Sequence, residues 1–350
     1  RPALSPADPP RRNPFLLGVF LSTTAVLLFQ VVQTRIRSVI AWYYLAFFAI
    51  SVAMLGMTAG AVWVYLKRAQ LTPDKLSTLL ADTALMTAVA MPASVMVQFC
   101  LITKLTPTVT SVFAWALLLT VMTVPYIFAG ITVSLALTRS PFPVSVVYGV
   151  DLLGAALGCA LVIVVLNVLD GPSATMFAGL VASLAAYAFA RGATAPEQAT
   201  LQRRRRWRRP VSLAILLALV IPLNASIPFG FKPVMVKDSF EGGFRTRTEL
   251  WNSYSRIVAY PPAAATPLLW GPSPLFNAKL AVPQSFLNID GAAATVMYHF
   301  GGTRDSLDFL RYDVVNLAYH LPGIAKSAVI GVGGGRDVLA AYLYGVKDVT

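Results

Sequence analysis

The segment Ser327–Tyr344 has the residue types and spacing best suited to holding a ligand. An apolar run is followed by a cluster of glycines and then by helix-forming residues, which predicts a buried strand, a tight turn and a helix. Glycines let the backbone turn sharply and approach a ligand, and the first N–H groups of the helix are free to bind an anion. The pattern predicts a nucleotide-type site at the turn glycines Gly331, Gly333, Gly334 and Gly335.

The acidic residue that would identify the nucleotide lies outside the sequence. In such folds it closes the second strand, about 20 positions after the glycines. Val349 starts that strand and the chain stops at Thr350. Asp337 is no substitute, because a carboxylate just inside a helix favours the N-terminal dipole. From this stop, and from a start at Arg1 rather than Met, we expect a piece of a longer chain.

The residues before this segment contain strand and turn patterns. Glu249–Tyr260 alternates like a strand, and Pro261–Pro274 is typical of a loop. The dipeptide Asp290-Gly291 between two extended runs predicts a hairpin. A helix is expected from Asp305 to Tyr319.

Composition places most of the chain in a membrane. Hydrophobic residues make up 57% and charged residues 12% of the sequence, and the mean hydropathy is +0.67. Soluble domains carry roughly 25% charged residues. Residues 13–231 are therefore predicted to form a bundle of six or seven membrane helices, after a disordered lead-in, residues 1–12. The candidate spans are 13–34, 38–66, 83–103, 105–138, 152–169, 171–190 and 211–231.

The distribution of basic residues predicts the orientation of the bundle. The net charge of +13 is concentrated in a few loops and in the run Arg203–Arg209, which favours contact with anionic lipid over nucleic acid. The N-terminus and this run are expected inside the cell. If 211–231 crosses the membrane, the C-terminal domain lies outside. If it lies in the interface, the domain lies in the cytosol, where adenosyl cofactors are made, and this placement is the expected one.

Within the bundle, two features could serve packing or function. Gly154 and Gly158 form a small-residue face that lets helices approach closely. Asp151 either sits near the membrane interface at a helix start or lines a path for a cationic solute. Cys100 and Cys159 are interpreted as small core residues, with no spacing that predicts a disulfide or a metal site.

Several segments together resemble the membrane-bound spermidine synthase-like proteins, in which a helical bundle precedes a polyamine aminopropyltransferase domain. The resemblance spans most of the chain. It rests on Tyr148–Gly158, Trp251–Ile257, Asn288–Gly291, Tyr319–Leu321 and Val329–Leu339.

The resemblance implies a small β-domain at residues 232–300, followed at residues 301–350 by the beginning of an S-adenosylmethionine-type Rossmann domain that is incomplete. It also implies a transferase that uses decarboxylated S-adenosylmethionine, or S-adenosylmethionine itself, with a small-molecule amine as acceptor and no metal. Its catalytic aspartate would fall beyond Thr350, so the catalytic residues are unknown. Tyr312, Asp313 and His320 are the candidates for the substrate side. The sequence departs from the family at Ser255, where a glutamine is expected, and at Gly335, where the family's glycine loop has an aspartate. Further departures are Asp313 in place of a glutamine and two extra residues before His320.

Other functions remain open at this point. The cofactor could support methyl transfer, or the domain could bind a nucleotide without catalysis in a transporter or sensor. A dehydrogenase fits less well, because strand hairpins precede the glycine turn. The expected partners are the lipid bilayer and the amine; a homo-oligomer is left open.

Overall fold

The computed structural model describes residues 10–101, 106, 108–193, 200–228, 230–241 and 248–350. The chain divides into two compact units. Unit 1 comprises Arg1–Gly242 with Trp251–Ser255, and unit 2 comprises Gly243–Leu250 with Arg256–Thr350. Most of the expected lead-in, residues 1–9, lies outside the described part, and the first helix begins at Arg12.

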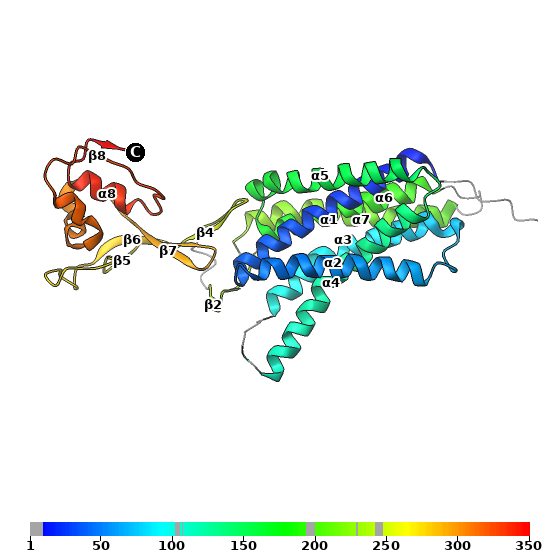
Figure 1. Cartoon of the computed structure of the whole chain (residues 1–350), viewed down its shortest axis with the longest axis horizontal. Coiled ribbons are helices and arrows are strands. Elements are labelled where there is room, and N and C mark those ends of the chain that lie inside the picture. Colours follow the sequence, from blue (N-terminus) through cyan, green and yellow to red (C-terminus); the bar gives the residue numbers. More distant parts are fainter. Residues whose placement is uncertain (1–9, 102–105, 107, 194–199, 229, 242–247) are drawn as a thin grey trace, which may run out of the picture. The chain divides into compact units, whose positions relative to one another are not determined.

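Unit 1 contains seven helices that are long and apolar enough to cross a membrane (Figure 1). Seven is the larger of the two predicted numbers of membrane helices, and the finding is consistent with a multi-pass membrane protein. The helices are α1 (Arg12–Ile40), α2 (Leu45–Leu66), α3 (Leu76–Cys100), α4 (Val109–Thr138), α5 (Val144–Val168), α6 (Gly171–Gly192) and α7 (Thr200–Ser226).

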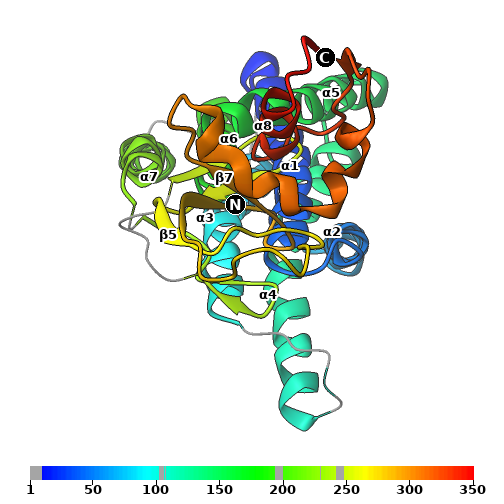
Figure 2. The ribbon, with the colours of Figure 1, turned by 90° about the vertical axis from the view of Figure 1, so that its left-hand side faces the viewer.

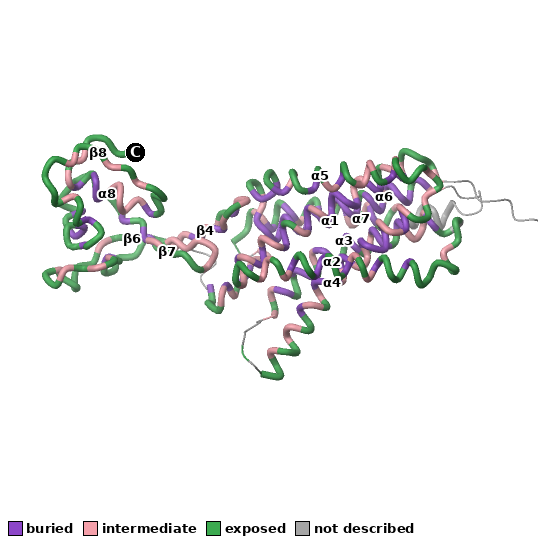
Figure 3. The backbone as a smooth tube through the Cα atoms, in the orientation of Figure 1, coloured by how far each residue is buried: buried purple, intermediate pink, exposed green. Residues whose placement is uncertain are grey.

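Helix α6 is the most buried of the seven: 78% of its most apolar window is inside the bundle. It is built largely of alanine, glycine and serine, and it packs on α1, α3 and α7. Helix α2 pairs with α4, and α5 lies on α1. Buried residues accordingly run along α1 and α6, while α5 and α2 carry long exposed stretches (Figure 3). Small residues at the centre let backbones approach, the main source of helix association in lipid.

The predicted glycine face on α5 is confirmed. A Cβ atom on Gly154 would lie 2.4 Å from the Phe20 carbonyl oxygen of α1, and one on Gly158 would lie 2.6 Å from that of Thr24. The Thr24 hydroxyl donates a hydrogen bond to the Gly154 carbonyl, 2.9 Å away. A second contact of this kind joins α2 to α4, where a Cβ on Gly60 would lie 2.4 Å from the Ile127 carbonyl oxygen.

Two helices begin earlier than the charge-free windows suggest. Helix α3 includes Asp82, which is exposed, and α5 includes Asp151 in its second turn. One carboxylate oxygen of Asp151 is buried without a hydrogen-bond partner among the described residues. Cys100 and Cys159 are both free and exposed on the bundle, so interpreting them as core residues is wrong.

Helix α7 runs the length of α6 in the opposite direction. The Ser183 hydroxyl donates to the Pro210 carbonyl (2.6 Å), and the Asn224 amide donates to the Ser173 hydroxyl (2.8 Å). The start of α7 therefore lies at the bundle end where α6 finishes; we call this the arginine end, because Arg203–Arg209 lies there. The end of α7 lies at the opposite end, beside the start of α6.

The chain after α7 is fixed at this opposite end. Asp170 accepts a hydrogen bond from the Ser173 backbone at the start of α6 and forms a buried ion pair with Lys232. Strands β1 (Met235–Val236) and β2 (Ser239–Phe240) then form a short hairpin. The Lys237 backbone donates to the Ile40 carbonyl at the end of α1, 3.0 Å away.

Unit 2 contains a five-stranded sheet of order β3-β4-β6-β5, with β7 also paired to β6. The strands are β3 (Thr248–Trp251), β4 (Arg256–Ala259), β5 (Ala263–Ala265), β6 (Val282–Ile289) and β7 (Ala293–Tyr298). The hairpin at Asp290-Gly291 is confirmed: both residues are left-handed, with φ of 53° and 69°.

Three expectations for unit 2 are wrong in detail. Glu249–Tyr260 is two strands rather than one, because the Asn252 side chain accepts from the backbone N–H groups of Tyr254 and Ser255 and closes a turn. The expected loop 261–274 contains β5, which pairs with β6. The expected helix Asp305–Tyr319 is two 3₁₀ helices, η3 (Arg304–Tyr312) and η4 (Val314–His320), separated by extended backbone at Asp313.

The last elements form a β-α-β crossover. Strand β8 (Lys326–Ser327) pairs in parallel with β9 (Asp348–Val349), and α8 (Arg336–Leu343) connects them. The parallel pairing extends one step further, since the Val329 backbone donates to the Thr350 carbonyl. Helix α8 packs on η3 and β7, beside which it lies in Figures 1 and 2. The core that they share contains Val296, Tyr298, Leu307, Phe309, Leu310, Ala340 and Leu343.

Candidate functional site

The glycine turn connects β8 to α8. Gly331, Gly333 and Gly335 adopt left-handed conformations, with φ of 76°, 55° and 82°, which side chains with a Cβ rarely adopt. Gly334 is needed for space instead: a Cβ there would lie 2.0 Å from the Val296 carbonyl oxygen of β7. The structure therefore brings the four predicted glycines into one turn, and each has a physical reason to be glycine.

The N-terminus of α8 opens onto this turn. Gly335 caps the helix without a side-chain hydrogen bond. The first N–H groups of a helix have no partner within it, and they attract negatively charged groups. The turn thus has the two features that suit it to a phosphate or a ribose edge: close backbone approach and free donors.

Arg336, the first residue of α8, lies beside this turn. Its guanidinium is 3.2 Å from Asp337, 3.8 Å from Asp313 and 5.9 Å from the centre of the Trp270 ring. The sequence analysis missed both Arg336 and Trp270. An arginine directly after the glycines was the available signal for the first, whereas Trp270 is 66 residues away and nothing in the sequence links it to the turn.

Asp313, a predicted substrate-side residue, is buried and already used by the fold. Its carboxylate accepts from the backbone N–H groups of Trp270 and Gly271, both at 3.3 Å, and faces Arg336. Its side chain is 0% exposed. Asp313 therefore positions Arg336 and the 270–271 backbone, and it offers no open carboxylate to a substrate.

The other two substrate-side candidates have other neighbours. Tyr312 is 36% exposed, and the centre of its ring lies 6.0 Å from that of Phe276. His320 is exposed and forms a 2.7 Å hydrogen bond with the Tyr344 hydroxyl. Tyr344 follows the last residue of α8, so this pair lies at the far end of a helix about 12 Å long. Burial raises the pKa of Tyr344, and the nearby Arg311 guanidinium opposes that rise.

Comparison of the chain with protein-family models, with curated proteins and with solved structures finds no match.

Proposed function

We propose that unit 2 binds the adenosyl part of S-adenosylmethionine, or of its decarboxylated form, at the glycine turn. The observation that carries this proposal is the parallel crossover β8–α8–β9 with its turn of left-handed glycines. In parallel α/β sheets, ligands bind at the carboxyl ends of the strands, next to the helix N-terminus. The Rossmann-like domain is part of this proposal.

The chemistry that follows is group transfer to an amine. The amine nitrogen bonds to the carbon next to the sulfonium, the bond between that carbon and the sulfur breaks, and the sulfur leaves as a neutral thioether. A carboxylate takes the proton that the amine loses. Asp313 does not suit this role, because Arg336 and the backbone N–H groups of Trp270, Gly271 and Val315 already surround its carboxylate. The cofactor turn serves aminopropyl and methyl transfer equally, and aminopropyl transfer is preferred because of the resemblance to spermidine synthase-like proteins.

A nucleotide-binding module without catalysis is the second candidate, favoured by the course of α7. This helix spans the bundle, so the chain leaves it at the end opposite the arginine run. If the arginine end is cytoplasmic, as the positive-inside rule predicts, the chain enters unit 2 on the other side of the membrane. A transferase needs a cytosolic unit 2 for its cofactor supply; a receptor for an extracellular nucleoside does not.

Binding tests the ligand assignment. The full chain in an uncharged detergent is titrated calorimetrically with S-adenosylmethionine, its decarboxylated form and methylthioadenosine. Gly331→Ala and Gly323→Ala are matched: both glycines are left-handed, with φ of 76° and 86°, and neither would place its Cβ within 4 Å of another residue. We expect binding to the parent and to Gly323→Ala, and at least tenfold weaker binding to Gly331→Ala. Absent binding, or equal binding by both variants, refutes the site.

Labelling tests the side of the membrane. Cys100 and Cys159 are first replaced by serine, and a single cysteine is then introduced at Ala264 in unit 2 or at Thr138 at the arginine end, both exposed positions. A membrane-impermeant maleimide is added to intact cells. Labelling at 264 but not at 138 supports the binding module, and the reverse supports the cytosolic transferase.

A further inference from the structure

Arg37 is a buried cation in the last turn of α1. Its exposed fraction is 2%, and among the described residues its Nε and Nη2 have no hydrogen-bond partner. Arg37 lies between the predicted spans 13–34 and 38–66 and so would fall in a loop, whereas in the structure it belongs to α1 and is buried inside the bundle. An unpaired charge in a membrane-embedded interior is strongly unfavourable, so it indicates a ligand or a partner.

A hydrogen-bond chain directs a second unused donor to the same place. The Tyr126 hydroxyl donates to Gln33 Oε1 at 3.2 Å, and Gln33 Nε2 donates to Gln98 Oε1 at 3.5 Å. This leaves Gln98 Nε2 without a partner among the described residues, and Gln98 is 1% exposed. The unused groups of Arg37 and Gln98 are all donors, which an anion would satisfy.

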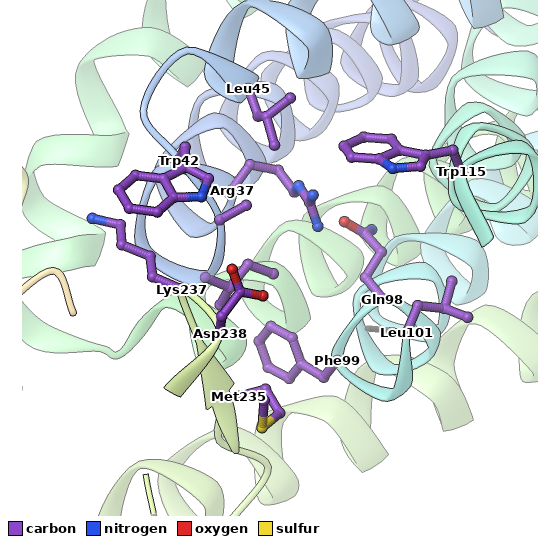
Figure 4. Close-up of a pocket in the computed structure, with 12 residues that line it drawn as sticks. Arg37, Trp42, Leu45, Gln98, Phe99, Leu101, Trp115, Met235, Lys237 and Asp238 are labelled. Atoms are coloured by element: carbon purple, nitrogen blue, oxygen red, sulfur yellow. The ribbon is translucent and has the colours of Figure 1, made fainter. Parts of the chain in front are cut away.

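Both side chains line one cavity of about 90 Å³ within unit 1. This is room for several waters, or for one oxyanion. Figure 4 shows the Arg37 guanidinium pointing into the space between the Gln98 amide and the Trp115 ring. The aromatic residues Trp42 and Phe99 form further parts of the wall.

Two further ionisable residues, Lys237 and Asp238 at the turn of the β1–β2 hairpin, also line the cavity. The Lys237 ammonium lies over the Trp42 ring, 5.9 Å from its centre. Within the described residues no ion pair joins Asp238 to Arg37. A phosphodiester carries one negative charge, and guanidinium pairs with phosphate through two parallel hydrogen bonds.

The neighbouring surface indicates the depth of this cavity in a membrane. Trp42, Tyr43 and Tyr44, between α1 and α2, are 42%, 74% and 43% exposed. Tryptophan and tyrosine gather where lipid headgroups meet the hydrocarbon. The opening of the cavity is therefore expected at the level of the lipid phosphates.

We propose that this cavity binds a phosphate group, held by Arg37 and Gln98, and that its source is the headgroup of an anionic membrane lipid. This site is separate from the glycine turn, since all of its residues belong to unit 1. It would give the bundle a specific lipid ligand at the end of the bundle from which the chain leaves for unit 2.

The test uses the full chain in a maltoside detergent with three probes: short-chain phosphatidylglycerol, inorganic phosphate and short-chain diacylglycerol. Binding is measured by native mass spectrometry and by thermal shift. Arg37→Met removes the proposed ligand contact. Arg35→Met removes the same charge two residues away on α1, from a side chain that does not line the cavity.

We expect phosphatidylglycerol to bind the parent and Arg35→Met, and at least tenfold weaker binding to Arg37→Met. Binding of phosphatidylglycerol alone identifies lipid as the source, whereas equal binding of inorganic phosphate identifies a free anion. Diacylglycerol binding as strongly as phosphatidylglycerol, or no phosphate probe binding the parent, overturns the proposal. If Arg37→Met does not fold, Asp238→Asn decides: removing the competing carboxylate should tighten binding about threefold or more, and unchanged or weaker binding overturns the proposal.

Discussion

Replacing Gly334 by alanine tests whether the glycine turn is held against β7 by the absence of a side chain. The added Cβ would lie 2.0 Å from the Val296 carbonyl oxygen, 2.6 Å from its carbon and 3.0 Å from the Met297 nitrogen. All three are backbone atoms of a strand that is paired with β6. Ordinary contact begins near 3.4 Å, so the turn must move by about 1.4 Å, the difference between 3.4 and 2.0 Å.

The expected loss of stability follows from that displacement. Gly334 has no left-handed backbone, so alanine there adds no dihedral strain, and the effect is purely steric. Forcing extra volume into a packed site costs about 1–3 kcal/mol. A moved turn also loses the hydrogen bond from the Gly335 backbone to the Val332 carbonyl, worth about 1 kcal/mol. We expect unit 2 to be destabilised by about 2–4 kcal/mol.

Hydrogen exchange of the full chain measures this locally. At about 1.4 kcal/mol per factor of ten, protection in β7 and α8 should fall by roughly 30- to 700-fold, while α1 and α6 keep theirs. Gly331→Ala is the control: it adds left-handed strain of about 1–2 kcal/mol but no contact with β7. Unchanged protection in β7 for Gly334→Ala would refute the packing argument.

Three further predictions concern the two units. Burial raises the pKa of Tyr298 to about 12. The neutral phenol therefore contributes at most about 2–3 kcal/mol to the stability of unit 2; this contribution is complete below pH 10 and is lost as the pH rises through 12. When the free energy of unfolding is measured against pH, the decrease between pH 10 and 12 should be absent in Tyr298→Phe. Gly158→Val should separate α5 from α1 and lower the thermal midpoint in detergent, whereas valine at Gly149, which has no neighbour within 4 Å, should not. Asp170→Ala should destabilise unit 1 by about 3–5 kcal/mol, because it leaves the Lys232 ammonium buried and unpaired. Asp308→Ala is the control in the same denaturation assay. It breaks an exposed ion pair with Arg311 and should cost under about 1 kcal/mol.

The sequence predicts the number of membrane helices well but not where they start and end. Stretches of sequence without charged residues correspond to the hydrocarbon layer of the membrane. A helix continues beyond this layer wherever its charged side chains can reach water or a partner. Asp82 and Asp151 therefore lie just before two predicted spans, but the helices α3 and α5 begin several residues earlier and include them. For the same reason Arg37 was assigned to a loop, although its spacing of four residues from Gln33 places both on one face of α1.

In unit 2 the sequence predicts turns that depend on a few adjacent residues, but it does not predict contacts between residues far apart in the chain. Asp290-Gly291 and the glycine turn depend on backbone conformations that only a few residue types adopt, so composition reveals them. Asp313 breaks the expected helix because it binds backbone N–H groups some 40 residues earlier in the chain, at Trp270 and Gly271. Hydrogen bonds between residues so far apart produce no periodic pattern of residue types, so a single sequence does not reveal them.

The polar face of α1 has a consequence for how the protein is made. The side-chain amide of Gln33 forms its hydrogen bonds with Gln98 and Tyr126, which follow it by 65 and 93 residues. At 5–20 residues per second these partners leave the ribosome roughly 3–19 s later. During that interval the first helix carries an unsatisfied amide and a guanidinium that hydrocarbon does not tolerate. We therefore expect its entry into the bilayer either to wait for α3 and α4 or to depend on insertion machinery that shelters this face.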